Sequence, residues 1–121
     1  MSSEDRARAL LAILSARQNL ALIHDWAKSR DLEALRSDTM ARYAIERAFI
    51  ALAAAMRDIP EPIIARHRLP ATLIAGFRNA LAHTYDDIID ERVILTIRED
   101  LPALDKQLAA IETTLAVEPR P

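Results

Sequence analysis

Apolar residues recur at steps of three and four along three long stretches of this chain, and this period constrains its fold more than any other feature. The members of the three stripes are Ile13, Ala16, Leu20, Ile23 and Ala27; Ile45, Phe49, Leu52, Met56 and Ile59; and Ile97, Leu101, Leu104, Leu108, Ile111 and Leu115. A helix brings positions three and four apart onto one face. Each stripe therefore predicts an amphipathic helix whose apolar face is buried in a core or a dimer interface.

The composition favours helices throughout. Hydrophobic residues make up 51% of the 121 residues, but aromatic residues only 4%, and glycine occurs once. The core must therefore consist mostly of Ala, Leu and Ile, which suit close helix packing. A chain of this length forms one domain. We predict an all-α protein, with a single domain over residues 1–118 and a frayed tail at 119–121.

Capping residues and prolines mark where the helices begin and end. Four main helices are expected: one from Ser3 to about Ser29, one capped by Asp38 and stopped by Pro60 and Pro62, one opened by Pro70 and carrying residues 73–83, and a last one whose start lies in the acidic set Asp86, Asp87, Asp90 and Glu91. Short turns are expected around residues 32–35 and within 61–69, and Pro102 should interrupt or kink the last helix. The prediction is an antiparallel bundle of four main helices with room for one short extra helix.

Charge and cysteine content exclude several classes of protein. The formal net charge is −2, which argues against nucleic-acid binding through a broad basic surface, so any such contact should be local. The chain has no cysteine, which excludes disulfides and favours a reducing compartment. No basic segment leads into an apolar run at the start, and no apolar stretch reaches about 20 residues. We expect a cytoplasmic protein without a membrane contact.

One stretch of eight residues, Arg78 to Tyr85, concentrates the chemistry of the chain. Arg78 can hold a phosphate with a fixed fork of donors, and His83 can exchange a proton near neutral pH. Tyr85 offers a hydroxyl as donor, acceptor or modification site. Asn79 lies four positions before His83 and can orient its imidazole from the same helix face. This combination is typical of phosphate chemistry.

The spacing of Arg78 and His83 poses a geometric problem. Five positions in one straight helix separate two side chains by roughly 140° around the axis. Either the helix ends near His83 and the chain bends so that His83 and Tyr85 turn back, or a second copy of the motif completes the site across a two-fold axis. The second alternative makes the protein an obligate homodimer.

The string Gly76-Phe77-Arg78-Asn79-Ala80-Leu81-Ala82-His83-Thr84-Tyr85, followed by Ile89-Asp90 and Leu101-Pro102-Ala103-Leu104, resembles the HepT-like toxins of the HEPN superfamily. The resemblance implies a HEPN-like fold and a metal-independent ribonuclease without a cofactor, acting on RNA as a homodimer. It implies that Arg78 and His83 are the catalytic pair and that Asn79 supports them. It further implies that a MntA-like minimal nucleotidyltransferase antitoxin adds AMP to Tyr85 and thereby silences the toxin.

The chain departs from the family pattern at two places. Relatives often carry an Ile-Gly-Glu-Ala segment in helix two, whereas here Ile45-Glu46-Arg47-Ala48 lacks the glycine and shifts the acid. Relatives also tend to have an aromatic residue soon after the proline that opens the motif helix, where this chain has Thr72. Neither change removes a catalytic group.

Simpler explanations compete with these assignments. An Arg and a His on one helix usually make caps or solvated pairs, so the chain could be a catalytically silent HEPN-type module that partners a nucleotidyltransferase, or a plain helical interaction protein. His24 and His67 lack partners at metal-ligand spacing. The acidic set Asp86, Asp87, Asp90 and Glu91 fits helix capping better than a divalent ion. Gly76 is explained first by close helix or subunit packing and second by close approach of RNA.

Overall fold

The computed structural model describes residues 2–83 and 91–117, apart from the side chains of residues 80–83 and 92. All regular elements in these residues are helical. The long segments are α1 (Ser3–Ala27), α3 (Thr39–Asp58), α5 (Ala71–His83) and a C-terminal run of α6 (Glu91–Leu95), the π-helical η1 (Thr96–Asp100) and α7 (Leu101–Val117). The short helices are α2 (Leu32–Ser37) and α4 (Glu61–His67), one more than expected. The all-α prediction is confirmed.

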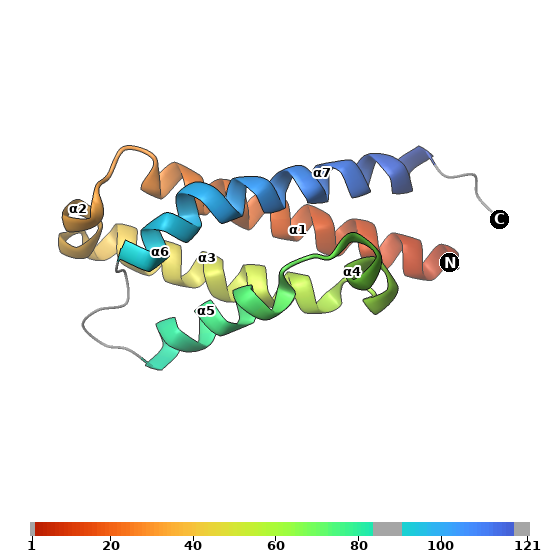
Figure 1. Ribbon diagram of the computed structural model, residues 1–121, viewed down its shortest axis with the longest axis horizontal. Coiled ribbons are helices and arrows are strands. Elements are labelled where there is room, and N and C mark those ends of the chain that lie inside the picture. Colours follow the sequence, from red (N-terminus) through yellow and green to blue (C-terminus); the bar gives the residue numbers. More distant parts are fainter. Residues whose placement is uncertain (1, 84–90, 118–121) are drawn as a thin grey trace.

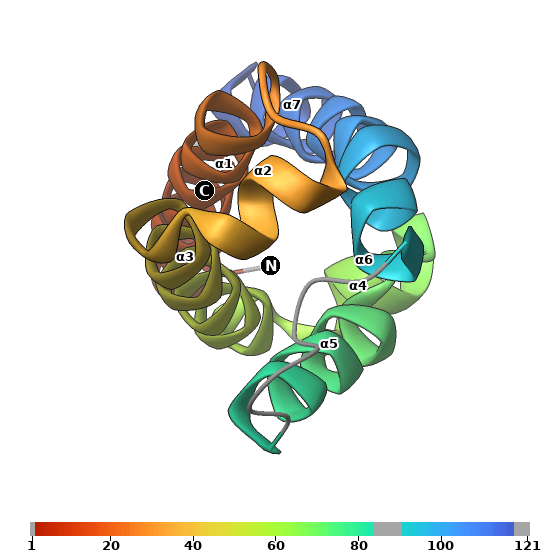
Figure 2. The same ribbon diagram turned by 90° about the vertical axis from the view of Figure 1, so that its left-hand side faces the viewer.

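The long helices run up and down around a common core. Helix α1 packs against α3 and α7, and α3 also packs against α5. Figure 1 shows that neighbouring helices run in opposite directions, and Figure 2 shows α4 and α6 on the side between α5 and α7. Among the helices in the described ranges, none is long and apolar enough to cross a membrane.

The core contains every member of the three apolar stripes that the sequence marks. All sixteen of those side chains are buried, and they belong to one connected cluster. Phe49 and Leu108, each fully buried, lie in the middle of two of the stripes. Burial of these faces is the main stabilising contribution to the bundle, because apolar surface removed from water contributes about 25 cal/mol per Å².

Side-chain caps set the starts of the first three helices. Ser2, Asp31 and Asp38 each accept a hydrogen bond from the backbone amide three residues further on, at 3.0, 2.8 and 3.0 Å. Each cap satisfies an amide that has no partner inside its helix. The cap predicted at Asp38 is confirmed, and the first helix begins one residue after Ser2 as its cap requires.

The prolines act differently from the prediction at one place and as predicted at another. Residues 61–67, expected as an irregular piece or a single turn, form the regular helix α4, because Pro60 and Pro62 lie before or within its first turn, where a missing amide hydrogen costs nothing. Pro102 does not stop the last helix, but the α-helical pattern is interrupted directly before it, as predicted. The chain enters it through the π turn of η1, in which the Leu101 amide donates to the Thr96 carbonyl five residues back.

Candidate functional site

Helix α5 presents the predicted motif, and a sharp turn sets where it begins. Arg68 ends α4 in the left-handed conformation with a φ of 53°, which is unusual for a residue other than glycine. Buried Leu69 and Pro70 follow, and the Ile74 amide donates to the Pro70 carbonyl at 3.2 Å. From Ala71 the helix continues without a break to His83.

Two apolar contacts fix the rotation of α5 against α3. Ile74 is 1% exposed, and the ring of Phe77 stacks on Phe49 of α3 with centroids 5.9 Å apart and planes 23° apart. These contacts turn one face of α5 inward. Arg78 consequently lies half-buried at the edge of the packed face, and Asn79 next to it is exposed.

The opposite face of α5 is open. Leu73 is 43% exposed, and a Cβ added to Gly76 would meet no heavy atom of the described residues within 4 Å. Close helix packing within the chain is therefore the wrong explanation for Gly76, which leaves subunit packing and approach of RNA. Figures 1 and 2 show that the C-terminal end of α5 protrudes from the other helices.

Arg78 is not engaged by any other described side chain. Within residues 2–83 and 91–117 it forms no hydrogen bond or ion pair. Arg17 shows the contrast, because its guanidinium contacts Asp105 at 2.9 Å and Glu112 at 3.0 Å, and the hydrogen bond from Arg17 to Asp105 raises the Arg17 pKa further. The donors of Arg78 are thus available for a phosphate, which a guanidinium binds in a bidentate manner.

The remaining motif residues are only partly covered by the structure. Positions 78 and 83 belong to the same uninterrupted helix, so they lie about 140° apart around its axis, and a chain bend would have to follow His83. The side chain of His83 and all of Tyr85 lie outside the described residues. The structure thus places Arg78 and Asn79 at neighbouring positions of α5, and the predictions for His83 and Tyr85 lie outside what it describes.

Two charged residues of α3 were not singled out by the sequence pattern. Arg42 and Glu46 lie two turns and one turn before Phe49, and antiparallel packing puts them toward the C-terminal half of α5. Burial raises the pKa of Glu46, and Arg42 partly opposes this shift. The Arg42 Nε is buried without an acceptor among the described residues, while its Nη1 donates to the Arg36 carbonyl at 3.3 Å. The signal in the sequence that could have identified Arg42 and Glu46 is their spacing of four residues, which places both on one face of a helix.

No three His, Asp or Glu side chains of the described residues come together in a way that would hold a metal ion. His24 is exposed and His67 is half-buried. Glu91 is exposed in the first turn of α6, where the sequence predicts an acidic helix start. The other members of that acidic set, Asp86, Asp87 and Asp90, lie outside the described residues.

Comparison with known families settles the relationship of this chain. The family described as ribonuclease HepT-like matches residues 16–111, which include α3, α4, α5 and the whole Arg78–Tyr85 motif. The chain belongs to the HepT-like family. No match was found among curated proteins or solved structures. Membership supports a ribonuclease of the HEPN type, and the HepT-like match covers every residue that the sequence proposes for the site.

The two departures from the HepT-like pattern fall on the motif helix and its neighbour. Glu46, present where relatives often have glycine, is half-buried on α3, whereas Thr72 is exposed in the first turn of α5. Glu46 thus lies on α3, the helix that packs against α5, and Thr72 lies on α5 itself. They alter the surroundings of the HepT-like motif and leave its residues intact.

Proposed function

We propose that this HepT-like chain is a cytoplasmic, homodimeric, metal-independent endoribonuclease, the toxin of a toxin-antitoxin pair. Arg78 and His83 are its catalytic residues, and Asn79 supports His83. The antitoxin is a MntA-like minimal nucleotidyltransferase that adds AMP to Tyr85. The observation that carries the proposal is the complete motif inside the family match, together with the position of Arg78 on α5, where its side chain has no partner among the described residues.

The chemistry needs a base, an acid and a cation. His83 takes the proton of the RNA 2′-hydroxyl, the 2′-oxygen then bonds to the adjacent phosphorus, and the bond from phosphorus to the 5′-oxygen breaks. The leaving 5′-oxygen receives a proton, which regenerates a neutral hydroxyl. Arg78 stabilises the extra negative charge on the phosphate oxygens of the transition state, where an electrostatic contact is most effective. The products are a 2′,3′-cyclic phosphate and a 5′-hydroxyl.

The angular separation on α5 favours a site shared by two copies. Because positions 78 and 83 lie about 140° apart on one helix, a single copy cannot easily direct both side chains at one phosphate. A two-fold axis brings a second motif to the same cleft, so that two His83 side chains divide the roles of base and acid. The C-terminal end of α5 protrudes from the other helices, which supports a contact with a partner there (Figure 2).

Modification of Tyr85 provides a physical route to inhibition. An attached AMP adds bulk and the negative charge of a phosphodiester close to Arg78 in the sequence. This phosphodiester would bind the guanidinium of Arg78, which the RNA phosphate requires. The test is the intact mass of the chain, expressed with and without its neighbouring nucleotidyltransferase. One or more AMP-sized increments located on Tyr85 only in the presence of the partner are expected, and an unmodified Tyr85 under both conditions would contradict the silencing mechanism.

A catalytically silent HEPN-type module, which binds a nucleotidyltransferase without cleaving RNA, is the alternative function. The half-buried Glu46, found where relatives often have glycine, favours it because a carboxylate beside α5 opposes the approach of a phosphate. Ribonuclease assays separate the two. We expect His83→Ala to abolish cleavage and Arg78→Ala to lower it by about 10²–10³-fold, while the circular dichroism spectrum of each is unchanged. Arg57→Ala and His24→Ala, both at exposed positions away from α5, are the matched controls and should cleave normally.

A further inference from the structure

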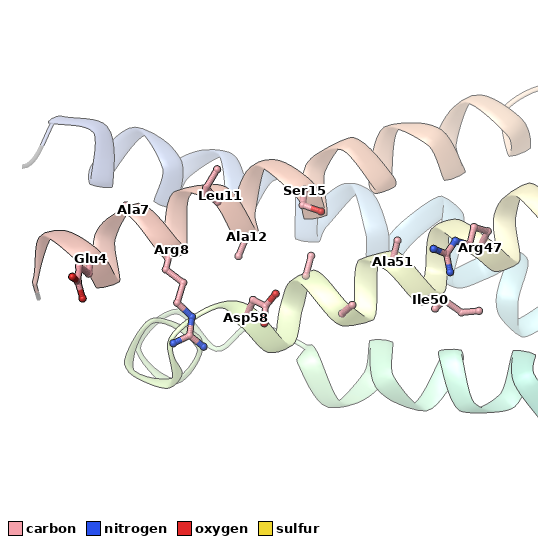
Figure 3. Close-up of a pocket in the computed structure, with 12 residues that line it drawn as sticks. Glu4, Ala7, Arg8, Leu11, Ala12, Ser15, Arg47, Ile50, Ala51 and Asp58 are labelled. Carbon is pink, nitrogen blue, oxygen red and sulfur yellow. The ribbon is translucent and has the colours of Figure 1, made fainter.

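A groove of about 860 Å³ runs between α1 and α3, and all of its twelve lining residues come from these two helices (Figure 3). Its floor is made of small side chains, and Leu11 and Ile50 stand on its two rims (Figure 3). The small residues are Ala7, Ala12, Ser15, Ala51, Ala54 and Ala55. Because short side chains allow backbones to approach closely, the groove can accept the ridge of another helix.

Leu11 is the corresponding ridge. It is 68% exposed, although it is a large aliphatic side chain directly beside an alanine-lined floor. The floor and the projecting side chain thus occur on the same face of the same molecule. That face carries both the hollow and the side chain that would fill it.

The charges of the groove are opposite at its two ends. Glu4, Arg8 and Asp58 lie at one end, and Arg47 lies at the other (Figure 3). None of these four forms an ion pair with another described residue. Formal charges sum to −1 at the first end and +1 at the second. Arg8 also lines a neighbouring hollow beside α4, toward which its side chain points in Figure 3.

We propose that this groove binds the same groove of a second copy of the chain, about a two-fold axis at its centre. Rotation by 180° lays Arg47 of each copy against Glu4 and Asp58 of the other, and it directs each Leu11 at the alanine floor opposite. An isologous contact requires a surface that is complementary to itself, and this surface has that property in both shape and charge.

The contact is expected to be weak. Twelve residues line the groove, whereas a standard interface uses about 20–30 residues a side. The association should therefore be weak and should depend on concentration in about the micromolar range. It involves α1 and α3 and none of the motif residues of α5, so it is separate from the shared catalytic cleft proposed above and gives a second way for copies to assemble.

A charge swap tests the two-fold arrangement. Arg47→Glu makes both ends negative and Asp58→Arg makes both ends positive, so each single variant should weaken the association more than about tenfold. The double variant carries both changes, restores opposite ends and should restore association. Lys106→Glu, on the exposed face of α7, is the control and should associate like the wild type. Failure of the double variant to recover, or normal association of both single variants, would overturn the proposal.

A cross-link locates the contact directly, because the chain has no cysteine of its own. Ala51→Cys places one thiol near the middle of the groove, and a short bismaleimide should join two such chains. Thr113→Cys, on the exposed face of α7, is the matched control and should remain uncoupled. Absence of coupling in the Ala51→Cys variant, or equal coupling in both variants, rejects the groove as the contact. The readout is independent of RNA cleavage, so it distinguishes failure of this interface from failure of the catalytic proposal.

Discussion

At the scale of single residues, Arg78 has the greatest weight in the catalytic proposal. Its half-buried position at the edge of the packed face of α5 follows from the contacts of Ile74 and Phe77. Two other arginines of this bundle, Arg17 and Arg30, are engaged. Arg17 joins α1 to α7, and Arg30 donates to the Trp26 carbonyl at 2.8 Å and to Asp38 at 3.3 Å. Such engaged arginines stabilise the fold, whereas an unengaged one can bind a substrate.

The geometry of the guanidinium gives the first prediction. Arg78→Lys keeps the charge and loses the planar fork, so we expect it to retain a small part of the cleavage rate. Arg78→Ala should lose about 10²–10³-fold, as for removal of one charge-stabilising donor. The rates are compared at saturating RNA in one buffer. A wild-type rate for the Lys variant would show that the fork has no role beyond charge.

The cap at Asp38 gives a prediction about pH. The Ala41 amide donates to its carboxylate, and with Arg30 nearby the pKa of Asp38 lies below its ordinary value. Because the folded pKa is depressed, this stabilisation is present above the unfolded pKa of about 4 and is lost as the pH falls through the folded pKa. Asp38→Ala should lower the melting temperature by a few degrees at pH 7. The difference from wild type should shrink at acidic pH, and a constant difference down to about pH 2 would contradict this origin.

At the scale of the elements, the apolar stripes predicted three buried helix faces correctly, because the period of a helix is a local property. The same local signals placed the cap at Asp38. They treated Pro60 and Pro62 as a stop, although prolines are also tolerated in the first turn of a helix such as α4. Whether a proline ends one helix or begins another depends on what the next residues pack against.

The candidate site shows the same limit. Arg78 and Asn79 could be identified from the motif, but their exposure depends on the rotation of α5, which the contact between Phe49 and Phe77 sets. Arg42 and Glu46 approach α5 for the same reason and carry no motif of their own. The sequence pattern therefore could not predict the contacts between helices that are far apart in the sequence.

Gly76 gives the prediction at this scale. Because a Cβ at this position meets no atom within 4 Å, Gly76→Ala should raise the free energy of unfolding by about 0.5–1 kcal/mol through higher helix propensity. Urea unfolding measures this change. If RNA or a second copy approaches α5 closely, the same variant should also lose cleavage activity despite its higher stability. A destabilised variant would contradict the open environment of Gly76.

At the scale of the whole molecule, the chain forms a helical bundle with two separate candidate surfaces. The end of α5 carries the motif, and the outer face of α1 and α3 carries the self-complementary groove. The salt bridges of Arg17 connect α1 to α7, and the hydrogen bond from Gln107 to the His67 carbonyl connects α7 to α4. None of these contacts involves the motif on α5 or the groove. The two surfaces can therefore assemble copies independently.

A shared catalytic cleft predicts a particular mixing behaviour. If wild-type and His83→Ala chains are refolded together in equal amounts, half of the dimers contain one copy of each. When both His83 side chains serve one cleft, only the wild-type dimers are active, about a quarter of the total. When each chain works alone, half of the activity remains. Activity per chain after co-refolding, with dimer formation checked by sedimentation, decides between them.

The most direct test of metal-independent ribonuclease activity compares two substrates in the presence of a metal chelator. One is an RNA, and the other is the same RNA with a single 2′-deoxy residue at the cut site. We expect the purified chain to cut the RNA and to leave a 2′,3′-cyclic phosphate and a 5′-hydroxyl. The deoxy-substituted strand should stay intact at that position, because it lacks the attacking hydroxyl. Equal cleavage of both strands, or an RNA that stays uncut at every enzyme concentration, would contradict the proposed chemistry.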